Sequence, residues 1–323
     1  MADLSFFHAT QPNSPTPLVA AATAVRAAGL RRLWIGQSLA LESFGVLSYV
    51  AAKVPGVGFG TAVSLTPLQH PALAATSLRT VAALSGQPVA GAFGVSEPRV
   101  IGALGLQPYE RPGTAAGDFA AAVRAMVGGG RMEDSASYPG ASFSLPPLDG
   151  IRPGQIEVGL GVLRRGMARA AGRGADFGVT WLTPPAWIRE ELAPAAAEAA
   201  RKAGVEAPRM RAVVHAAVTE DPSEAATVLE QGAGAHLRLP HYRAMIEQSL
   251  GIPTDAPAAD AVRALLAAGA IVHGTPEGIG EALRAHAAAS GVDELLLNPF
   301  VPRGGPRLDR LLTDVAAGFH AAA

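Results

Sequence analysis

The chain has no cysteine and few charged residues, and each shortage excludes a class of chemistry. Without cysteine there are no disulfide frameworks, thiolate metal sites or thiol nucleophiles. Charged residues make up 16% of the sequence, and 26 Lys and Arg nearly balance 27 Asp and Glu. A net charge of -1 provides no broad basic field for phosphate backbones, so nucleic acid is a poor candidate partner. These shortages favour a small-molecule ligand.

Long hydrophobic runs are also missing. The longest stretch without Lys, Arg, Asp or Glu, Val54 to Leu78, is interrupted by several prolines and glycines that would break a membrane-spanning helix. The N-terminus carries Asp3, and the apolar part that follows, Leu4 to Phe7, is too short for a signal peptide. The sequence therefore predicts a cytoplasmic protein with no membrane partner.

Short apolar runs alternate with alanine-rich amphipathic stretches, the pattern of repeated βα units around a parallel sheet. The 323 residues, 49% of them hydrophobic, can bury the core of one large barrel or of two ordinary domains. Eight strands are predicted, at Leu4–His8, Leu33–Ile35, Val57–Ser64, Pro88–Gly94, Ile156–Gly161, Phe177–Thr183, Arg211–Thr219 and Glu294–Leu297. Helical patterns follow nearly every strand, at Pro17–Ala28, Glu42–Lys53, Pro71–Leu84, Thr114–Val127, Arg165–Gly172, Ala186–Ala203, Pro222–Gly232, from Pro276, and at Pro306–Phe319.

Eight such units favour an α/β fold of the (β/α)8 TIM-like type over a doubly wound open sheet. We expect residues 1–323 to form one barrel domain with two insertions, near 128–154 and 233–274. The second insertion contains helical patterns around His241–Leu250 and Ala258–Ala268. Long insertions in compact domains are often lids, so both are expected on the C-terminal face, beside a substrate pocket.

Five segments match one known pattern in the expected order. They are Gly60–Pro71 with the strand Val89–Gly94 that follows it, Tyr138–Leu145, Met167–Asp176, Gly274–Glu277 and Gly291–Leu295. Together they resemble the bacterial luciferase-like monooxygenase superfamily, and the resemblance extends over the whole chain. It implies a TIM-like barrel that binds FMN or the deazaflavin F420 at the C-terminal strand ends, and an oxidoreductase.

A flavin-type cofactor needs a flat support for its ring and donors for its phosphate. The resemblance places the ring on a bulge that ends the third strand and often contains a non-prolyl cis peptide, here at Ala62, Val63 and Ser64. The alternative is a plain strand end. The phosphate is expected where a strand ends and a helix starts, at Gly159, Leu160, Gly161 and Val162. The alternative for that run is a tight βα turn with solvated arginines nearby, Arg164 and Arg165.

The reacting edge of the cofactor is where this sequence departs from its relatives. After the second strand many members of the superfamily carry a histidine that touches the cofactor or transfers a proton. Here Gln37 and Ser38 occupy that place. We expect both to lie at the cofactor, but a hydroxyl cannot replace an imidazole in proton transfer near neutral pH.

Two other residues are candidate catalysts. Glu97, after the fourth strand, is similar in position to the protonating glutamate of the F420-dependent sugar-phosphate dehydrogenase branch, and its alternative is a solvated loop carboxylate. His8 ends the first strand and could point into the barrel mouth, or be satisfied by backbone contacts. Trp181 could flank the ring. His236 and His241 have no metal-ligand spacing and are assigned to the surface or a lid; no metal site is predicted.

The sequence thus predicts an enzyme that passes a hydride between F420 and a C=C, C=N or C=O bond. The substrate would be a small molecule or a tailored natural product. One alternative is an FMN-dependent monooxygenase that uses oxygen, and another is a barrel that binds flavin or a ligand without turnover. Homodimerisation is common in the superfamily, but no residue pattern here argues for it.

Overall fold

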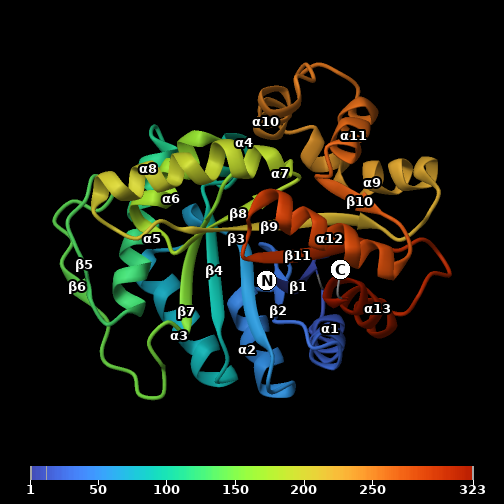
Figure 1. Ribbon diagram of the computed structural model, residues 1–323. Helices are drawn as coiled ribbons and strands as arrows, with labels where there is room; N and C mark the ends of the chain where they lie inside the picture. Colours follow the sequence, from blue (N-terminus) through green and yellow to red (C-terminus); the bar gives the residue numbers. More distant parts are fainter. Residues whose placement is uncertain (1, 12, 322–323) are drawn as a thin grey trace.

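Eight parallel strands close into a barrel in the computed structural model, which describes residues 2–11 and 13–321 (Figure 1). Around the barrel the strands are β1 (Asp3–His8), β2 (Arg32–Ile35), β3 (Gly58–Leu65), β4 (Val89–Gly94), β7 (Ile156–Gly161), β8 (Phe177–Trp181), β9 (Arg209–Ala217) and β11 (Glu294–Phe300). The pairing of β11 with β1 closes the ring. All eight predicted strands and the predicted (β/α)8 fold are confirmed.

An outer layer of helices covers the barrel, as expected for parallel strands that must be buried on both faces. It comprises α1 (Thr16–Ala27), α2 (Ser43–Lys53), α3 (Pro71–Ser85), α5 (Pro112–Val127), α6 (Arg165–Gly174), α8 (Ala193–Ala203), α12 (Pro276–Ser290) and α13 (Leu308–His320). Local signals fix several starts: the Thr275 hydroxyl accepts the Gly278 N–H at 3.1 Å, and Pro276 fills the first turn of α12. Shorter helical pieces are η1 (Thr66–Leu68), α4 (Pro98–Ala103), α7 (Pro185–Trp187) and η2 (Ile188–Leu192); α4 was not predicted.

The second insertion stands above the barrel mouth, at the upper right of Figure 1. It contains α9 (Pro222–Leu237), α10 (Pro240–Leu250), α11 (Ala258–Ala267) and β10 (Ile271–His273). The helices α10 and α11 agree with the prediction, whereas α9 continues five residues past its predicted end at Gly232. The strand β10 was not predicted, because three residues are too short to show alternation; it pairs with His215–Ala217 of β9.

The first insertion follows a different path. It connects the end of α5 to the start of β7, and both of these lie at the N-terminal end of the barrel. A short hairpin of β5 (Arg131–Met132) and β6 (Phe143–Ser144) carries its middle part along the outside of the barrel. Tyr138 then reaches the mouth, where its ring meets that of His70. Only this tip therefore fulfils the expectation of an insertion on the C-terminal face.

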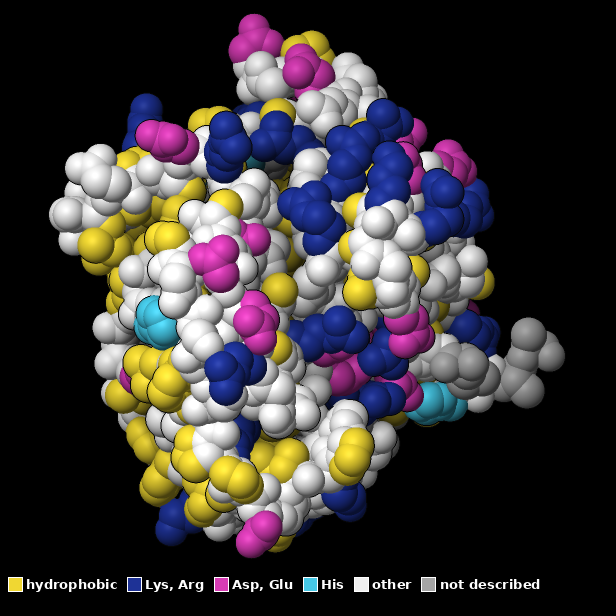
Figure 2. Space-filling model, turned by 90° about the vertical axis from the view of Figure 1, so that its left-hand side faces the viewer, with side chains coloured by type: hydrophobic (Ala, Val, Ile, Leu, Met, Phe, Trp, Pro, Cys, Tyr) yellow, Lys and Arg dark blue, Asp and Glu magenta, His cyan; other side chains and the backbone are white. Residues whose placement is uncertain are grey.

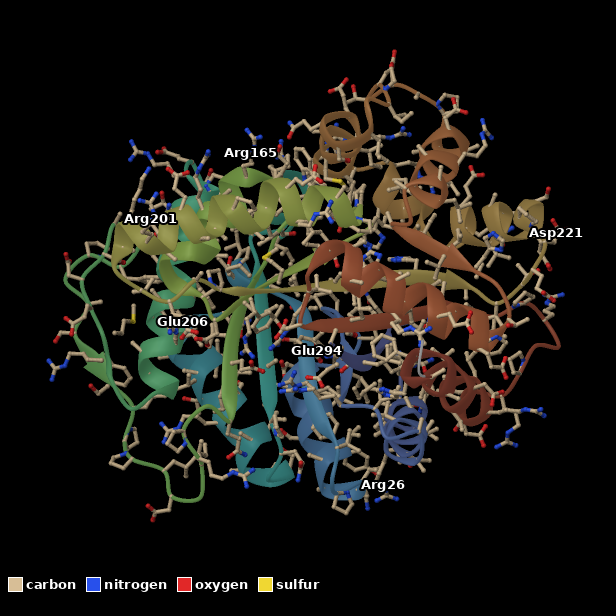
Figure 3. All side chains as sticks on the ribbon, in the orientation of Figure 1. Arg26, Arg165, Arg201, Glu206, Asp221 and Glu294 are labelled. Carbon is tan, nitrogen blue, oxygen red and sulfur yellow. The ribbon has the colours of Figure 1, made fainter. Side chains whose placement is uncertain are left out.

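Four charged side chains fill the N-terminal end of the barrel, and we call them the charged floor. Arg32 contacts Glu157 and Glu294 at 2.5 Å each, and Arg211 contacts the same two carboxylates at 2.7 and 3.2 Å. All four are buried. Figure 3 shows Glu294 near the centre of the barrel. Two positive and two negative charges balance, so each buried ion has partners.

Above the charged floor, aromatic rings from β2 and β8 fill the lumen. The ring of Trp34 lies over Gly60, and the ring of Phe177 lies over Gly159. A Cβ atom at either glycine would come within 2.4 Å of a ring atom, closer than real Cβ contacts allow. These two glycines are therefore required by packing inside the barrel.

Substitution of Gly159 by alanine should destabilise the protein, because the methyl group would overlap the Phe177 ring. We expect a loss of about 1–3 kcal/mol, the usual cost of overpacking a core. The matched control is Gly102→Ala in α4, where a Cβ would meet nothing within 4 Å. That control should be neutral or slightly stabilising in urea denaturation, and equal effects in the two variants would contradict the packing account.

Candidate active site

The mouth of the barrel opens at the C-terminal ends of the strands. Each strand is buried along most of its length but ends in, or is followed by, a partly exposed residue; these are His8, Gly36, Leu65, Gly94, Gly161, Trp181, Val218 and Phe300. Active sites of (β/α)8 barrels lie at this face because the eight βα loops meet there. The mouth is therefore where the predicted site residues must be sought.

The end of β3 has the geometry that the sequence predicted. The peptide between Ala62 and Val63 is cis, and the pairing of β3 with β4 shifts register between Thr61 and Ser64. The side chain of Val63 lies against two glycines, one on the adjacent strand β4 and one on β7, the strand beyond it. A Cβ at Gly94 would be 2.8 Å from one Val63 methyl, and a Cβ at Gly161 would be 3.0 Å from the other. We call this arrangement the Val63 seat.

Gln37 holds the bulge in place. Its backbone N–H donates to the Val63 carbonyl at 3.1 Å, and its side-chain oxygen accepts the Leu65 N–H at 3.0 Å. Its amide nitrogen donates to the Ser38 carbonyl at 2.9 Å. The Ser38 hydroxyl accepts two backbone N–H groups, from Ala40 and Leu41, at 3.2 Å each. Both residues thus shape the loop after β2, and their contact with a cofactor stays a prediction.

Most residues of the predicted phosphate-binding run, 159–162, make packing or hydrogen-bond contacts within the barrel. Gly159 makes room for Phe177, and the Val162 N–H donates to the Val179 carbonyl at 2.8 Å. Gly161 is the partly exposed member of the run. The first N–H groups of α6, at Arg165 and Gly166, have no acceptor within the helix. Figure 3 places Arg165 at the upper edge of the molecule, where its guanidinium pairs with Glu191. Binding of a phosphate at this run and helix start stays a prediction.

His8 lies at the end of β1, where it was predicted. Its Nδ1 is 3.1 Å from the Thr10 carbonyl, and burial lowers its pKa although this hydrogen bond opposes the shift. Because a carbonyl can only accept, Nδ1 carries the proton in the neutral ring and Nε2 is left with its lone pair. Neutral His8 is thus prepared to accept a proton at Nε2.

Glu97 precedes α4, and its side chain makes no capping hydrogen bond. It belongs to a group that includes His241 of α10. Burial lowers the pKa of His241; the positive charge of Arg164 lowers it further, and the carboxylate of Glu97 raises it. Glu97 and Arg164 are therefore close enough to His241 for their charges to affect it. The pKa of His8 shows no such effect of Glu97.

A cluster of aromatic and imidazole rings fills the opposite side of the mouth. The Trp181 ring lies 5.0 Å from Phe7, 4.7 Å from His215 and 5.1 Å from His236, between ring centroids. His236, assigned from sequence to the surface or a lid, lies on the inner side of the insertion. His215 was not singled out from the sequence, where its only signal was one polar residue in an apolar strand. Its side chain is fully buried, and burial lowers its pKa to about 3.

The outside of the barrel carries a cleft lined by exposed, charged side chains. Figure 2 shows Lys and Arg side chains gathered on the upper part of one face. There a cleft of about 240 Å³ between α6 and α8 is lined by exposed side chains, including Arg169, Arg173, Glu198 and Lys202. Among the described residues, no group of three or more potential ligands could hold a metal ion. No helix in the described part of the chain is long and apolar enough to cross a membrane.

A closed (β/α)8 barrel with a bulged third strand carries polar groups at its open mouth, the face at which enzymes of this fold have their active sites. The chain belongs to the luciferase-like monooxygenase family, whose model matches residues 3–294. A comparison with curated protein sequences gave no match. The family resemblance inferred from the sequence is confirmed.

Solved structures show the same fold. An F420-dependent secondary alcohol dehydrogenase, in complex with an F420–acetone adduct, is 14% identical over 99% of each chain with a TM-score of 0.74. The F420-dependent tetrahydromethanopterin reductase from Methanopyrus kandleri is 16% identical over 98% of this chain and 97% of its own, with a TM-score of 0.75. The EDTA monooxygenase from Chelativorans sp. BNC1 is 13% identical over 98% and 92%, with a TM-score of 0.72.

Proposed function

We propose that this protein is an F420-dependent oxidoreductase that acts on a C=C, C=N or C=O group of an organic substrate. The observation that supports it best is the Val63 seat, where the Val63 side chain packs against Gly94 and Gly161 and stays partly exposed at the open mouth. Such a surface suits the support of a flat ring. The bound deazaflavin would supply the hydride through C5 of its ring.

The residues of this chain then have distinct tasks. Val63 supports the ring, and Gln37 fixes the bulge through its bonds to Val63 and Leu65. Arg164 and the first N–H groups of α6 face the anionic tail. His8 Nε2 is the atom that accepts a proton when an alcohol is oxidised and returns it when a carbonyl is reduced. Glu97 is the alternative proton carrier.

Two considerations favour F420 over FMN. Glu97 stands after β4, where the F420-dependent branch has its protonating glutamate, and two structural neighbours with TM-scores of 0.74 and 0.75 are titled F420-dependent enzymes. An FMN-dependent monooxygenase is the second candidate, because the family model carries that description and the EDTA monooxygenase shares the fold.

Titration of the purified protein with F420 and with FMN tests the proposal. We expect F420 to bind at least about tenfold more tightly, and Arg164→Gln to weaken it by about tenfold or more, the loss typical of a charge-assisted contact. The control is Arg189→Gln, an exposed arginine of η2 paired with Glu190, which should leave F420 affinity unchanged. Tighter binding of FMN would favour the monooxygenase. Binding of neither would contradict the cofactor proposal and favour a ligand-binding barrel without turnover.

A further inference from the structure

Several buried nitrogen atoms without hydrogen-bond partners gather on one side of the barrel mouth. They are Trp181 Nε1, both ring nitrogens of His215, His236 Nδ1 and Asn298 Nδ2. The four residues are neighbours: ring centroids of Trp181 lie 4.7 Å from His215 and 5.1 Å from His236, and Asn298 is the register partner of His215. Buried polar groups in folded proteins almost always have partners, so a cluster of exceptions indicates a ligand. We call these four residues the polar wall.

The polar wall faces the Val63 seat across the barrel. His215 lies on β9, which is four strands from β3 in either direction around the ring of eight. Trp181 and Asn298 lie on the strands that flank β9, namely β8 and β11. A ring supported by Val63 would therefore turn its free face toward the polar wall. This is the space in which a second molecule must lie to react with that ring.

The polar wall carries no charge near neutral pH. Burial lowers the pKa of His215 to about 3 and also lowers the pKa of His236. The phenol of Tyr242, which meets His236 edge-on, is kept protonated because burial raises its pKa. The ring of His241 contacts that of Tyr242, and burial lowers the pKa of His241 as well. The charges of Arg164 and Glu97 act on that pKa with opposite signs. The buried arginines of the charged floor lie at the other end of the barrel and are paired with Glu157 and Glu294.

The polar wall offers several hydrogen-bond donors. The Trp181 indole N–H only donates, each neutral imidazole offers one donor and one acceptor, and the Asn298 amide has an unpartnered NH2 donor beside its carbonyl acceptor. A carboxylate, sulfonate or phosphate buried here would meet no cationic side chain of the polar wall to compensate its charge. A carbonyl or hydroxyl oxygen, in contrast, satisfies donors without bringing a charge.

From these observations we propose that Trp181, His215, His236 and Asn298 bind the substrate, and that this substrate presents an uncharged carbonyl or hydroxyl oxygen to them. The inference deepens the proposed function by restricting its substrate to neutral molecules. It predicts discrimination against anionic analogues of the same size. The restriction follows from the polar wall of this chain and does not depend on which flavin-type cofactor is bound.

Calorimetric titration with two matched probes tests the proposed preference for neutral substrates. Cyclohex-2-enone is the neutral probe and cyclohex-1-ene-1-carboxylate is the anionic probe. Both are titrated into the protein loaded with whichever oxidised cofactor binds, so that no turnover occurs, and into the protein alone. We expect the enone to bind at least about tenfold more tightly at neutral pH. Its affinity should stay constant from about pH 6.5 to 8.5, since the histidines of the polar wall remain neutral there.

Variants locate the binding. Trp181→Phe and Asn298→Leu should each lower the affinity for the enone by about fivefold to tenfold, because each removes one hydrogen bond. The affinity for the cofactor should stay unchanged. His215→Gln is a further variant that keeps donor and acceptor groups. The control is His286→Gln, a buried histidine of the outer helix α12 that also has an unpartnered ring nitrogen. This variant should bind both probes with the affinity of the unmodified protein.

Two results would overturn the inference: equal or tighter binding of the carboxylate, or unchanged enone affinity in the folded Trp181 and Asn298 variants. Should Trp181→Phe fail to fold, Asn298→Leu decides. A failure of the proposed function is recognised separately, because it appears as absent cofactor binding in the unmodified protein. The titrations without cofactor still report on the polar wall in that case.

Discussion

Replacing Glu294 by glutamine should be among the most destabilising single changes in this protein. Its carboxylate accepts hydrogen bonds from the Ser5 hydroxyl at 2.6 Å and the Trp34 indole at 3.0 Å, and pairs with the guanidinium groups of Arg32 and Arg211. Without its charge, Arg32 would be left with Glu157 alone, and Arg211 with Glu157 and the more distant Asp293 at 3.7 Å. Loss of one partner from a buried ion pair costs about 3–5 kcal/mol, because the remaining charge is left uncompensated inside the protein.

Urea denaturation measures this loss. The control is Glu190→Gln, which removes a carboxylate from an exposed pair with Arg189 and should cost less than about 1 kcal/mol. The double variant Glu294→Gln with Arg211→Gln restores charge balance on the charged floor. We expect it to lose less stability than the sum of the two single changes. Strict additivity, or a Glu294 effect no larger than the Glu190 effect, would show that the four charges are not coupled.

Acidification should destabilise the protein well before its carboxylates are protonated. Burial lowers the pKa of five of the eight histidines, namely His8, His215, His236, His241 and His286. The unfolded chain takes up protons near pH 6.5, whereas the folded protein does not, so stability falls as the pH drops below that value. For His215, with a folded pKa of about 3, the loss between pH 7 and about pH 4.5 is about 2–3 kcal/mol.

Glu157 acts in a lower pH window. Burial opposes its ionisation, but Arg211, Arg32 and Arg209 outweigh that effect and hold its pKa below the ordinary value. Its contribution to stability is therefore present above the unfolded pKa and is lost as the pH falls through the folded pKa. Burial raises the pKa of Asp293, which acts with the opposite sign. A comparison of variants is needed to isolate the histidines.

The free energy of unfolding should be measured at several pH values for the unmodified protein and for His215→Gln. We expect the variant to lose about 2–3 kcal/mol less than the unmodified protein between pH 7 and about pH 4.5, because glutamine does not titrate. His320→Gln, at an exposed position in the last turn of α13, should keep the original pH profile. A His215 variant with an unchanged profile would mean that this imidazole takes up its proton over the same pH range in the folded protein as in the unfolded chain.

These two predictions concern opposite ends of one barrel. The charged floor concentrates two arginines and two glutamates where no substrate has to enter, while the mouth is lined by imidazole, indole and amide groups that stay neutral. Because buried charges need partners, placing them together at the closed end leaves the polar wall at the open end free of charged side chains. The barrel can thus be held together by ionic contacts and still present a neutral polar wall to a ligand.

The pattern of the sequence was sufficient for the barrel. Continuous apolar runs such as Phe177–Trp181 can only be strands that are buried on both faces, and helix starts such as Thr275–Pro276 carry their signals locally. The segment Ala62–Ser64 was found through the resemblance, and the bulge and cis peptide are present there. The misses were α4, η1, β5, β6 and β10, which are too short for periodicity to show.

The amino-acid sequence by itself determined the eight strands, most of the helices and the family, because hydrophobic period and capping residues act over a few neighbours along the chain. Only the tertiary structure decided which side chains meet. Barrel closure sets Trp181, His215 and Asn298 side by side, and it brings Arg211 to Glu157 and Glu294. Those contacts join residues dozens to hundreds of positions apart. They depend on strand register and on the direction in which each side chain points, which no local pattern encodes.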